Sequence, residues 1–313
     1  MQFPFQLLAK RDFDCLGFGT NAVDYLIEVP EYPAYNSKVE LNKYIQAAGG
    51  EVASTMVGLQ RLGLKTAYIG RFGDDHAGDF GRRSLTDEGV NTDFAEQITG
   101  ANTQIAFIVI DARSGERTVI WKRDSLLGYS EAEAPVELVA RASVLHLTPH
   151  DAYAATAMAR AARQSGTVVS IDVDNVFNGI EELLPLVDIL IASAEFPGRF
   201  LGLTDHRQAL PEMADRFGCK VTGVTLGDKG SLLYCDGNFI STPGFAVPGG
   251  CRDTTGAGDA YRVGMIYGLL NETSIEEAAR SANAVAALKC RALGARTSLP
   301  KEDELHKFLD SQN

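Results

Sequence analysis

One motif in the sequence combines residue types and spacing that suit phosphoryl transfer. The run Asp253-Thr254-Thr255-Gly256-Ala257-Gly258-Asp259 leads into an apolar pattern over 260–270 that predicts a helix. Three small residues at a helix start leave several N–H groups uncovered, with the positive end of the helix dipole behind them. Asp259 falls in the first turn, where its carboxylate can face the same concavity. The N–H groups could stabilise a moving phosphoryl group while the carboxylate accepts a hydroxyl proton.

Two alternative interpretations compete with this chemistry. The same motif fits a structural role about equally well, in which Asp259 caps the helix and Gly256 and Gly258 form a tight turn. The run Gly17–Ala22 matches the dinucleotide fingerprint G-x-G-x-x-A, which would indicate a dehydrogenase. Residues 23–29 favour a strand rather than the helix that this fingerprint requires, so the dehydrogenase interpretation lacks its structural context.

The composition restricts the partners of the protein. Its 313 residues include 41 acidic and 29 basic side chains, a formal net charge of −12. Such a surface repels phosphate backbones and anionic lipids, so we expect no nucleic-acid partner and no membrane partner. A polyanion must then be bound locally, by N–H groups, a helix N-terminus or a metal. Five scattered cysteines without a CxxC pair are typical of a reduced protein, and we expect a cytoplasmic location.

The elements that position the motif alternate between strands and helices. This alternation predicts an α/β fold with a doubly wound, mostly parallel sheet and helices on both faces. The predicted strands are Phe13–Gly19, Lys65–Gly70, Ser143–Leu147, Val168–Asp172, Asp188–Ala192 and Val221–Leu226. The predicted helices are Glu51–Leu62, His76–Glu88, Ala152–Gln164, Arg207–Phe217, Gly256–Leu270, Ile275–Arg291 and Glu302–Leu309. Without a flexible linker or an internal repeat, residues 1–313 are expected to form a single domain.

Two regions break this alternation, because they contain strand-like segments without helices between them. They cover about residues 23–46 and 104–123, and the second reads as a hairpin with its turn at Arg113-Ser114-Gly115. We expect the two regions to pair as a small β-sheet over one edge of the main sheet. A sheet placed there could act as a lid over a site.

The sequence resembles the ribokinase family of carbohydrate kinases (phosphofructokinase-B type) over about residues 12–309. Asp253–Asp259 is similar to the family's C-terminal signature. The N-terminal signature, a di-glycine before a helix followed by G-x-x-G-D-D, is similar to Gly49–Ser54 and Gly70–Asp75. Further matching residues are Gly19 with Asp24, Thr225–Gly230, Ala282–Ala284 and Gly294–Arg296. The family resemblance implies a ribokinase-like fold and an ATP-dependent sugar kinase.

The resemblance also implies roles for individual residues. Asp259 would be the general base that activates a sugar hydroxyl toward the γ-phosphate of ATP, with Gly256, Ala257 and Gly258 as the anion hole. Asp24 would bind sugar hydroxyls, because a carboxylate accepts from two O–H groups at once. The other residues that the resemblance assigns to substrate are Gly49, Gly50 and Ser54, and those that it assigns to ATP are Thr225, Gly227, Gly230 and Asn283.

Two cations belong to the same resemblance. Asp253 and the backbone of Thr255, with carbonyls from 290–295, correspond to a monovalent cation site, K⁺, in many members. Mg²⁺ would arrive with ATP, held mostly by phosphates and water. Where members carry Asn-Glu-x-Glu, this chain has Ser193-Ala194-Glu195-Phe196, which leaves Glu195 as the candidate carboxylate for Mg²⁺, acting through water.

Departures from the family pattern leave the substrate open. Ala22, Glu51 and Ser54 replace an Asn, a Lys and an Asn that ribokinase itself carries, which makes ribose a poor candidate. Lys122 and Arg123, at the end of the lid hairpin, could meet the carboxylate of a sugar acid such as 2-keto-3-deoxygluconate, or could simply be a solvated strand end. A non-catalytic nucleotide or sugar sensor is a further alternative. By resemblance, a homodimer through the lid is expected.

Overall fold

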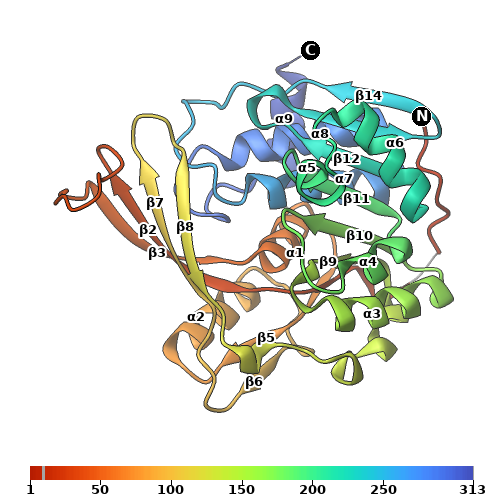
Figure 1. Cartoon of the computed structure of the whole chain (residues 1–313), viewed down its shortest axis with the longest axis horizontal. Helices are drawn as coiled ribbons and strands as arrows, with labels where there is room; N and C mark the ends of the chain where they lie inside the picture. The colour runs from red at the N-terminus through yellow and green to blue at the C-terminus, as the bar shows by residue number, and fades with distance from the viewer. Residues whose placement is uncertain (9–10, 313) are drawn as a thin grey trace.

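An eight-stranded sheet forms the centre of the protein, described by a computed structural model over residues 1–8 and 11–312 (Figure 1). Its strands, in spatial order, are β14 (Asn238–Thr242), β13 (Ser231–Cys235), β12 (Val221–Thr225), β11 (Ile189–Ser193), β10 (Val168–Val173), β9 (Ala142–Leu147), β1 (Phe13–Phe18) and β4 (Thr66–Ile69). From β4 to β12 neighbouring strands run parallel, whereas β13 and β14 run antiparallel. The mostly parallel α/β fold expected from the sequence is confirmed.

Helices cover both faces of this sheet, which is why its strands are apolar on both sides. Successive residues of β1 show the alternation, because Cys15 packs into one hydrophobic cluster and Leu16 into the other. The helices of the Cys15 cluster are α1 (Glu51–Arg61), α7 (Ala257–Leu270), α8 (Ile275–Lys289) and α9 (Glu302–Asp310). Those of the Leu16 cluster are α3 (Ala152–Ser165), α4 (Ile180–Leu183), α5 (Phe196–Leu201) and α6 (His206–Phe217).

The predicted helices are all present, with ends that shift by a few residues. α6 begins at His206 because the Asp205 side chain accepts a hydrogen bond from the Arg207 N–H and caps the helix. The β13–β14 hairpin was not among the predictions, although its turn carries a recognisable signal. Asp236 and Gly237 both have positive φ, 46° and 78°, the conformation that an Asp-Gly hairpin turn requires.

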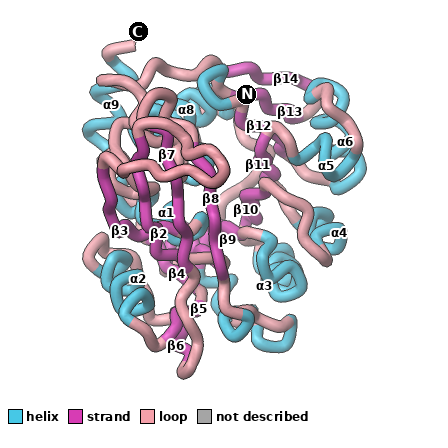
Figure 2. Tube along the Cα trace, turned by 60° about the vertical axis from the view of Figure 1, so that its left-hand side comes forward, coloured by secondary structure: helices cyan, strands magenta, loops and turns pink. Residues whose placement is uncertain are grey.

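A second, four-stranded sheet projects beside the main sheet (Figures 1 and 2). Its order is β3 (Lys43–Gly49), β2 (Ala22–Val29), β7 (Ile105–Asp111) and β8 (Arg117–Lys122). β2 pairs with β7, so the two regions that lack intervening helices do meet, as predicted. One face buries Leu26, Ile108 and Ile110 against Leu293. A two-stranded sheet of β5 (Arg71–Gly73) and β6 (Glu96–Ile98), with helix α2 (His76–Thr86), completes this side.

The strand order reverses between β1 and β9. The chain steps from β1 outward to β4 and later returns to β9 on the opposite side of β1. In open α/β sheets, ligands bind outside the carboxyl ends of the strands at such a switch point. The segments that follow the ends of β1, β9 and β10 are therefore brought to one edge of the sheet, where the small sheet also begins.

Candidate active site

Asp259 lies in the first turn of α7, at the position that the motif predicts. The helix begins after Gly256, whose φ of 75° is in the left-handed region that glycine adopts without strain. A Cβ at Gly256 would also lie 2.7 Å from the Cβ of Ala295, so the loop packs closely on the C-terminal segment. The N–H of Ala257 donates to the Thr254 carbonyl (3.1 Å). These contacts set the direction in which the first turn of α7 presents Gly258 and Asp259.

A second carboxylate, Asp172 at the end of β10, accompanies Asp259. Asp172 lies within hydrogen-bonding reach of Asp259 and also accepts from Arg262, whose Nη2 is 2.6 Å from Asp172 Oδ1. The same nitrogen donates to the Ile191 carbonyl (2.8 Å). Burial, followed by the negative charge of Asp172, raises the pKa of Asp259 to about 8, while Arg262 opposes the rise. A base with a pKa near the working pH suits proton transfer.

Asp24 and Gly49 lie against each other on neighbouring strands of the small sheet. Asp24 is buried on β2, and a Cβ on Gly49 would lie 2.0 Å from Asp24 Oδ2. Glycine at 49 therefore makes room for the carboxylate of Asp24. Gly50, with φ 89°, precedes α1, and a Cβ there would lie 2.3 Å from the Asn21 Cα. Burial raises the pKa of Asp24 to about 6, and Arg296 opposes that rise.

Arg296 contacts Gly49 and Ser54, and it was not predicted as a site residue. Its guanidinium is buried and donates to the Gly49 carbonyl, to Ser54 Oγ (3.1 Å) and to Ser84 Oγ (3.0 Å). Ser54, predicted to touch substrate, is buried and accepts this bond from Arg296. The sequence signal was the arginine in the Gly294-Ala295-Arg296 tail, which places a charge where the chain returns to the site.

Glu51, at the start of α1, lies beside a histidine that contacts two aromatic rings. Its carboxylate accepts from Thr20 Oγ1 (3.3 Å) and lies 3.4 Å from His150 Nδ1. The His150 ring lies 4.7 Å from Phe177 and 6.1 Å from Trp121, between ring centres. Burial, followed by the nearby carboxylates of Asp172, Asp259 and Asp174, raises the pKa of Glu51 well above its usual value.

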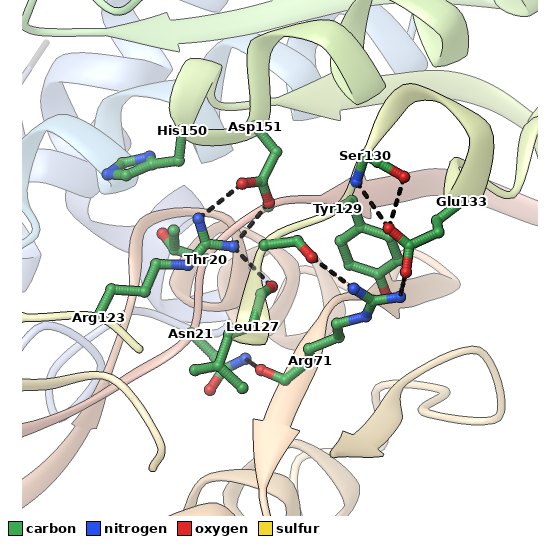
Figure 3. Close-up of polar contacts among 12 residues, drawn as sticks. Thr20, Asn21, Arg71, Arg123, Leu127, Tyr129, Ser130, Glu133, His150 and Asp151 are labelled. Carbon is green, nitrogen blue, oxygen red and sulfur yellow. Dashed lines mark hydrogen bonds and ion pairs between the residues drawn. The ribbon is translucent and has the colours of Figure 1, made fainter. Parts of the chain in front are cut away.

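Arg123, at the end of β8, is bound by a carboxylate of this chain (Figure 3). It donates to both oxygens of Asp151, at 2.8 and 2.6 Å, and to the Leu127 carbonyl at 2.9 Å. The side chains of Arg123 and Asp151 are only 16% and 11% exposed. Of the two charges that could meet a sugar acid, Arg123 is therefore already paired within the chain, whereas Lys122 is exposed on β8.

The predicted nucleotide residues surround the turn that follows β12. Thr225 ends the strand, and Gly227, exposed with φ 62°, has open space where a Cβ would stand. A Cβ on Gly230 would lie 2.1 Å from the Thr242 carbonyl. The Asn283 amide donates to Ser231 Oγ and to the same Thr242 carbonyl, both at 3.3 Å. Gly230 and Asn283 therefore support the turn, while Gly227 leaves room beside it.

Glu195 and Arg117 lie at two further positions around the site. Glu195 is exposed just before α5, and its backbone carbonyl accepts from the Arg199 N–H (3.1 Å). Arg117 is exposed on β8 and donates to Thr254 Oγ1 (2.7 Å), which links the small sheet to the loop before α7. Sequence reasoning did not single out Arg117, because only the pairing of β8 with β7 brings it to this loop.

The monovalent cation implied by the resemblance does not fit the residues at Asp253. Both carboxylate oxygens of Asp253 accept backbone N–H groups, from Thr255 (2.8 Å) and from Gly294 (2.7 Å). The ammonium of Lys289 lies 2.8 Å from the Asp253 carbonyl and 3.9 Å from its Oδ2, and both side chains are fully buried. A positive charge is thus already present. For Mg²⁺, residues 1–8 and 11–312 contain no group of three or more His, Cys, Asp or Glu that could hold a metal.

This architecture defines the class of protein: a doubly wound α/β fold with a small accessory sheet and a group of interacting carboxylates near the strand-order reversal, as in ribokinase-like proteins. Comparison with family models then identifies the family. Residues 18–302 match the pfkB family carbohydrate kinases, and the chain belongs to that family. It is therefore a kinase of the ribokinase and PfkB type that acts on a sugar or a nucleoside.

Individual relatives agree with this assignment. The chain is 27% identical to a nucleoside kinase of Methanothermobacter thermautotrophicus, over 97% of each chain. It is 30% identical to fructokinase-1 of Oryza sativa subsp. japonica, covering 97% of this chain and 100% of the relative. The structure of Arabidopsis thaliana ribokinase complexed with ribose and ATP superposes with a TM-score of 0.81 at 24% identity, over 95% of this chain and 98% of the other. Within the described residues, no helix has the length and apolar character needed to span a membrane.

Proposed function

We propose that this protein transfers the γ-phosphate of ATP to a hydroxyl of a neutral sugar or nucleoside, with Asp259 as the general base. The observation that carries the proposal is the placement of Asp259 in the first turn of α7, beside Asp172 and among the carboxylates that raise the pKa of Glu51. A carboxylate with a pKa of about 8 is a competent acceptor for a hydroxyl proton.

Residues around the start of α7, together with Asp24, take part in the transfer. Asp24 accepts hydrogen bonds from acceptor hydroxyls and holds the reacting hydroxyl near Asp259. As the acceptor oxygen forms its bond to the γ-phosphorus, the hydroxyl proton passes to Asp259 and the bond to the ADP oxygen breaks. The N–H groups of Gly256 and Gly258, with the helix dipole, stabilise the charge on the moving group, whereas the Ala257 N–H, also expected in the anion hole, already donates to the Thr254 carbonyl.

The ATP side of the site rests on the turn after β12. Gly227 has room beside it for the nucleotide, and Thr225, Gly230 and Asn283 shape the turn that would hold it. Mg²⁺ bound with ATP would neutralise phosphate charge, and Glu195, which is exposed, is our candidate to reach it through water. The Arabidopsis thaliana ribokinase structure contains ATP, which supports ATP as the donor in this family.

The negative charge near Asp259 favours a neutral sugar or nucleoside over a sugar acid as the phosphoryl acceptor. The acidic side chains of Glu51, Asp172 and Asp174 interact near Asp259, and Asp24 is a further buried carboxylate, while Arg123 is bound to Asp151 and Arg262 to Asp172. An anionic acceptor would have to enter a negative field and displace an existing ion pair. Hydroxyl groups, by contrast, are the donors that unpaired carboxylate oxygens accept.

A nucleoside is the second candidate acceptor, and one observation favours it. The rings of Trp121, His150 and Phe177 form a chain of aromatic contacts next to Glu51, and Trp121 is 54% exposed. Aromatic faces of this kind bind planar bases by stacking. A nucleobase could lie against these rings while its ribose meets Asp24 and Asp259.

A coupled ADP-release assay over hexoses, ketoses, sugar acids and nucleosides tests the proposal. We expect turnover with a neutral sugar or a nucleoside, and a loss of about 10²–10⁴-fold in kcat for Asp259→Asn with the fold and ATP binding retained. Near-normal turnover of this variant would remove Asp259 as the base. Binding of ATP without turnover on any acceptor would favour a non-catalytic sensor instead.

We also propose that residues 1–313 form one domain in which the small sheet is a lid, and that the lid forms a homodimer. The face opposite the Leu26 core carries the stacked rings of Tyr25, Tyr44 and Phe107, and Ile120 lies across from Phe107. Tyr44, Phe107 and Ile120 are 53%, 43% and 59% exposed. A second copy of the same apolar face would cover these side chains.

Light scattering after gel filtration tests the dimer. Phe107→Glu with Ile120→Glu should give a monomer, whereas Val136→Glu, at an exposed apolar residue outside the small sheet, should leave the dimer intact. A monomeric wild-type protein at micromolar concentration would contradict this proposal.

A further inference from the structure

We propose that the ammonium of Lys289 takes the place of the monovalent cation in this protein, so that the loop before α7 is ordered by a tethered charge and not by K⁺. This role of Lys289 is separate from the phosphoryl transfer proposed above, because it concerns how the Asp253–Gly258 loop is held. Asp253 connects this loop to the end of α8 and to the C-terminal segment, because its contacts extend to all three.

The contacts of Asp253 are those of a completed site. Its carboxylate accepts N–H groups from Thr255 (2.8 Å) on one side and from Gly294 (2.7 Å) on the other. Its carbonyl accepts from Lys289 Nζ (2.8 Å), which also lies 3.9 Å from Asp253 Oδ2. The Cys290 carbonyl, one of the oxygens that a cation would need, accepts the Arg252 N–H (2.8 Å).

The ammonium cannot easily leave this place. Lys289 is the last residue of α8, and its side chain is fully buried together with that of Asp253. The Lys289 backbone is itself held, because its carbonyl accepts from Ser298 Oγ. A buried ammonium without its carboxylate and carbonyl would be strongly destabilised, so Lys289 and Asp253 keep each other in place.

A monovalent ion would therefore find the Asp253 carboxylate and the Cys290 carbonyl already engaged, and the negative charge of Asp253 already balanced. The single negative charge of Asp253 is balanced by the single positive charge of Lys289. Placing K⁺ beside a buried ammonium would bring two like charges together where water does not screen them. Lys289 supplies the same positive charge from within the chain, so no ion has to be desolvated and bound from solution.

The test compares thermal unfolding of the full-length protein in KCl with that in tetramethylammonium chloride at equal ionic strength. Wild type should have the same Tm in both salts. Lys289→Ala removes the charge and leaves room, so its Tm should fall in tetramethylammonium chloride and recover by several degrees in KCl. Lys289→Met removes the charge but fills the space, so its Tm should fall without recovery. Lys65→Met, at an exposed lysine, serves as the control.

Each outcome bears on the inference separately from catalysis, because no ATP or acceptor is present. A rise in the Tm of wild type that is specific to K⁺ would overturn the proposal, and this measurement stands even if both variants fail to fold. A folded Lys289→Ala protein that ignores K⁺ would also overturn it, since the vacated place would then not be a cation site. Thallium(I) titrated into wild type and followed by ²⁰⁵Tl NMR should show no bound signal.

Discussion

The guanidinium of Arg262 lies 2.6 Å from Asp172, and Asp172 in turn lies beside the proposed base Asp259. Arg262 and Asp259 are one turn apart on α7, whereas Asp172 is the second-to-last residue of β10 in the main sheet. The arginine is 3% exposed and the aspartate 12%, so water screens this pair only weakly. The three side chains act as one electrostatic unit, in which the two neighbours of Asp259 push its pKa in opposite directions.

This arrangement predicts opposite effects on the pH dependence of turnover. Asp172→Asn removes the negative neighbour, so the pKa of Asp259 should fall and the acid limb of kcat/KM should move down by about one pH unit. Arg262→Gln removes the positive neighbour and should move that limb upward. The pH–rate profile of each variant gives the answer, with folding verified by circular dichroism because breaking a buried pair can cost about 3 kcal/mol. If the acid limb moved in the same direction in both variants, the opposing effects of Asp172 and Arg262 on Asp259 would be contradicted.

Protein stability should depend on the charge of Asp259 as well. The pKa of this carboxyl rises from an ordinary value of 3.8 to about 8 on folding, so the folded protein holds more protons than the unfolded chain between these pH values. Stability therefore falls as pH rises through this window. Asp259→Asn should be more stable than wild type at pH 9, by on the order of 1 kcal/mol, and similar to it at pH 4.

Thermal unfolding at several pH values checks this dependence. The groups that interact with Asp259, which are Asp172, Arg262, Arg117, Glu51 and Arg296, stay in place in the variant, but Asp259→Asn also removes the charge that helps to raise the pKa of Glu51, so the gain at pH 9 belongs to Asp259 together with these neighbours. Asp215→Asn, at an exposed carboxylate on α6, is the matched control and should show no such gain. If the variant were no more stable than wild type at pH 9, the ionised Asp259 carboxylate would not destabilise the folded protein.

Gly49 should be essential for the position of Asp24. The Cβ of Gly49→Ala would lie 2.0 Å from Asp24 Oδ2, and the carboxylate must move because Arg296 holds the Gly49 carbonyl in place. A displacement of this size should lower kcat/KM for the acceptor by on the order of 10²-fold, with KM for ATP close to that of wild type. Gly198→Ala is the control, since its Cβ would make an ordinary 3.5 Å contact with Thr204. Equal effects of the two substitutions would argue against the role of Asp24.

Arg123 and Asp151 should behave as a structural pair and not as a receptor for acids. Arg123→Ala and Asp151→Ala should each cost about 2 kcal/mol of unfolding free energy, and the double variant little more, because either change alone leaves a half-buried charge unpaired. Urea denaturation of the four proteins measures this coupling. If Arg123 instead binds a sugar acid, KM for 2-keto-3-deoxygluconate should rise in Arg123→Ala alone while KM for neutral sugars stays constant.

Local patterns in the sequence were sufficient for the fold and for the motif at Asp259. Small residues before an apolar helix predict the start of α7, and the alternation of short apolar runs with helical patterns predicts the doubly wound sheet, because both signals depend on neighbours within a few residues. The β13–β14 turn shows that a local signal, here Asp236-Gly237, can be present and still be overlooked.

The partners of the buried charges were decided only by the tertiary structure. Arg262 meets Asp172, Arg123 meets Asp151, and Lys289 meets Asp253. These partners lie between 28 and 90 residues apart in the chain and come together through the strand order of the main sheet and the return of α8 to the loop before α7. The sequence by itself determined the presence of a kinase-like motif. Which charges remain free for a substrate or an ion depends on three-dimensional neighbours, because a buried charge takes whichever opposite charge the fold places beside it.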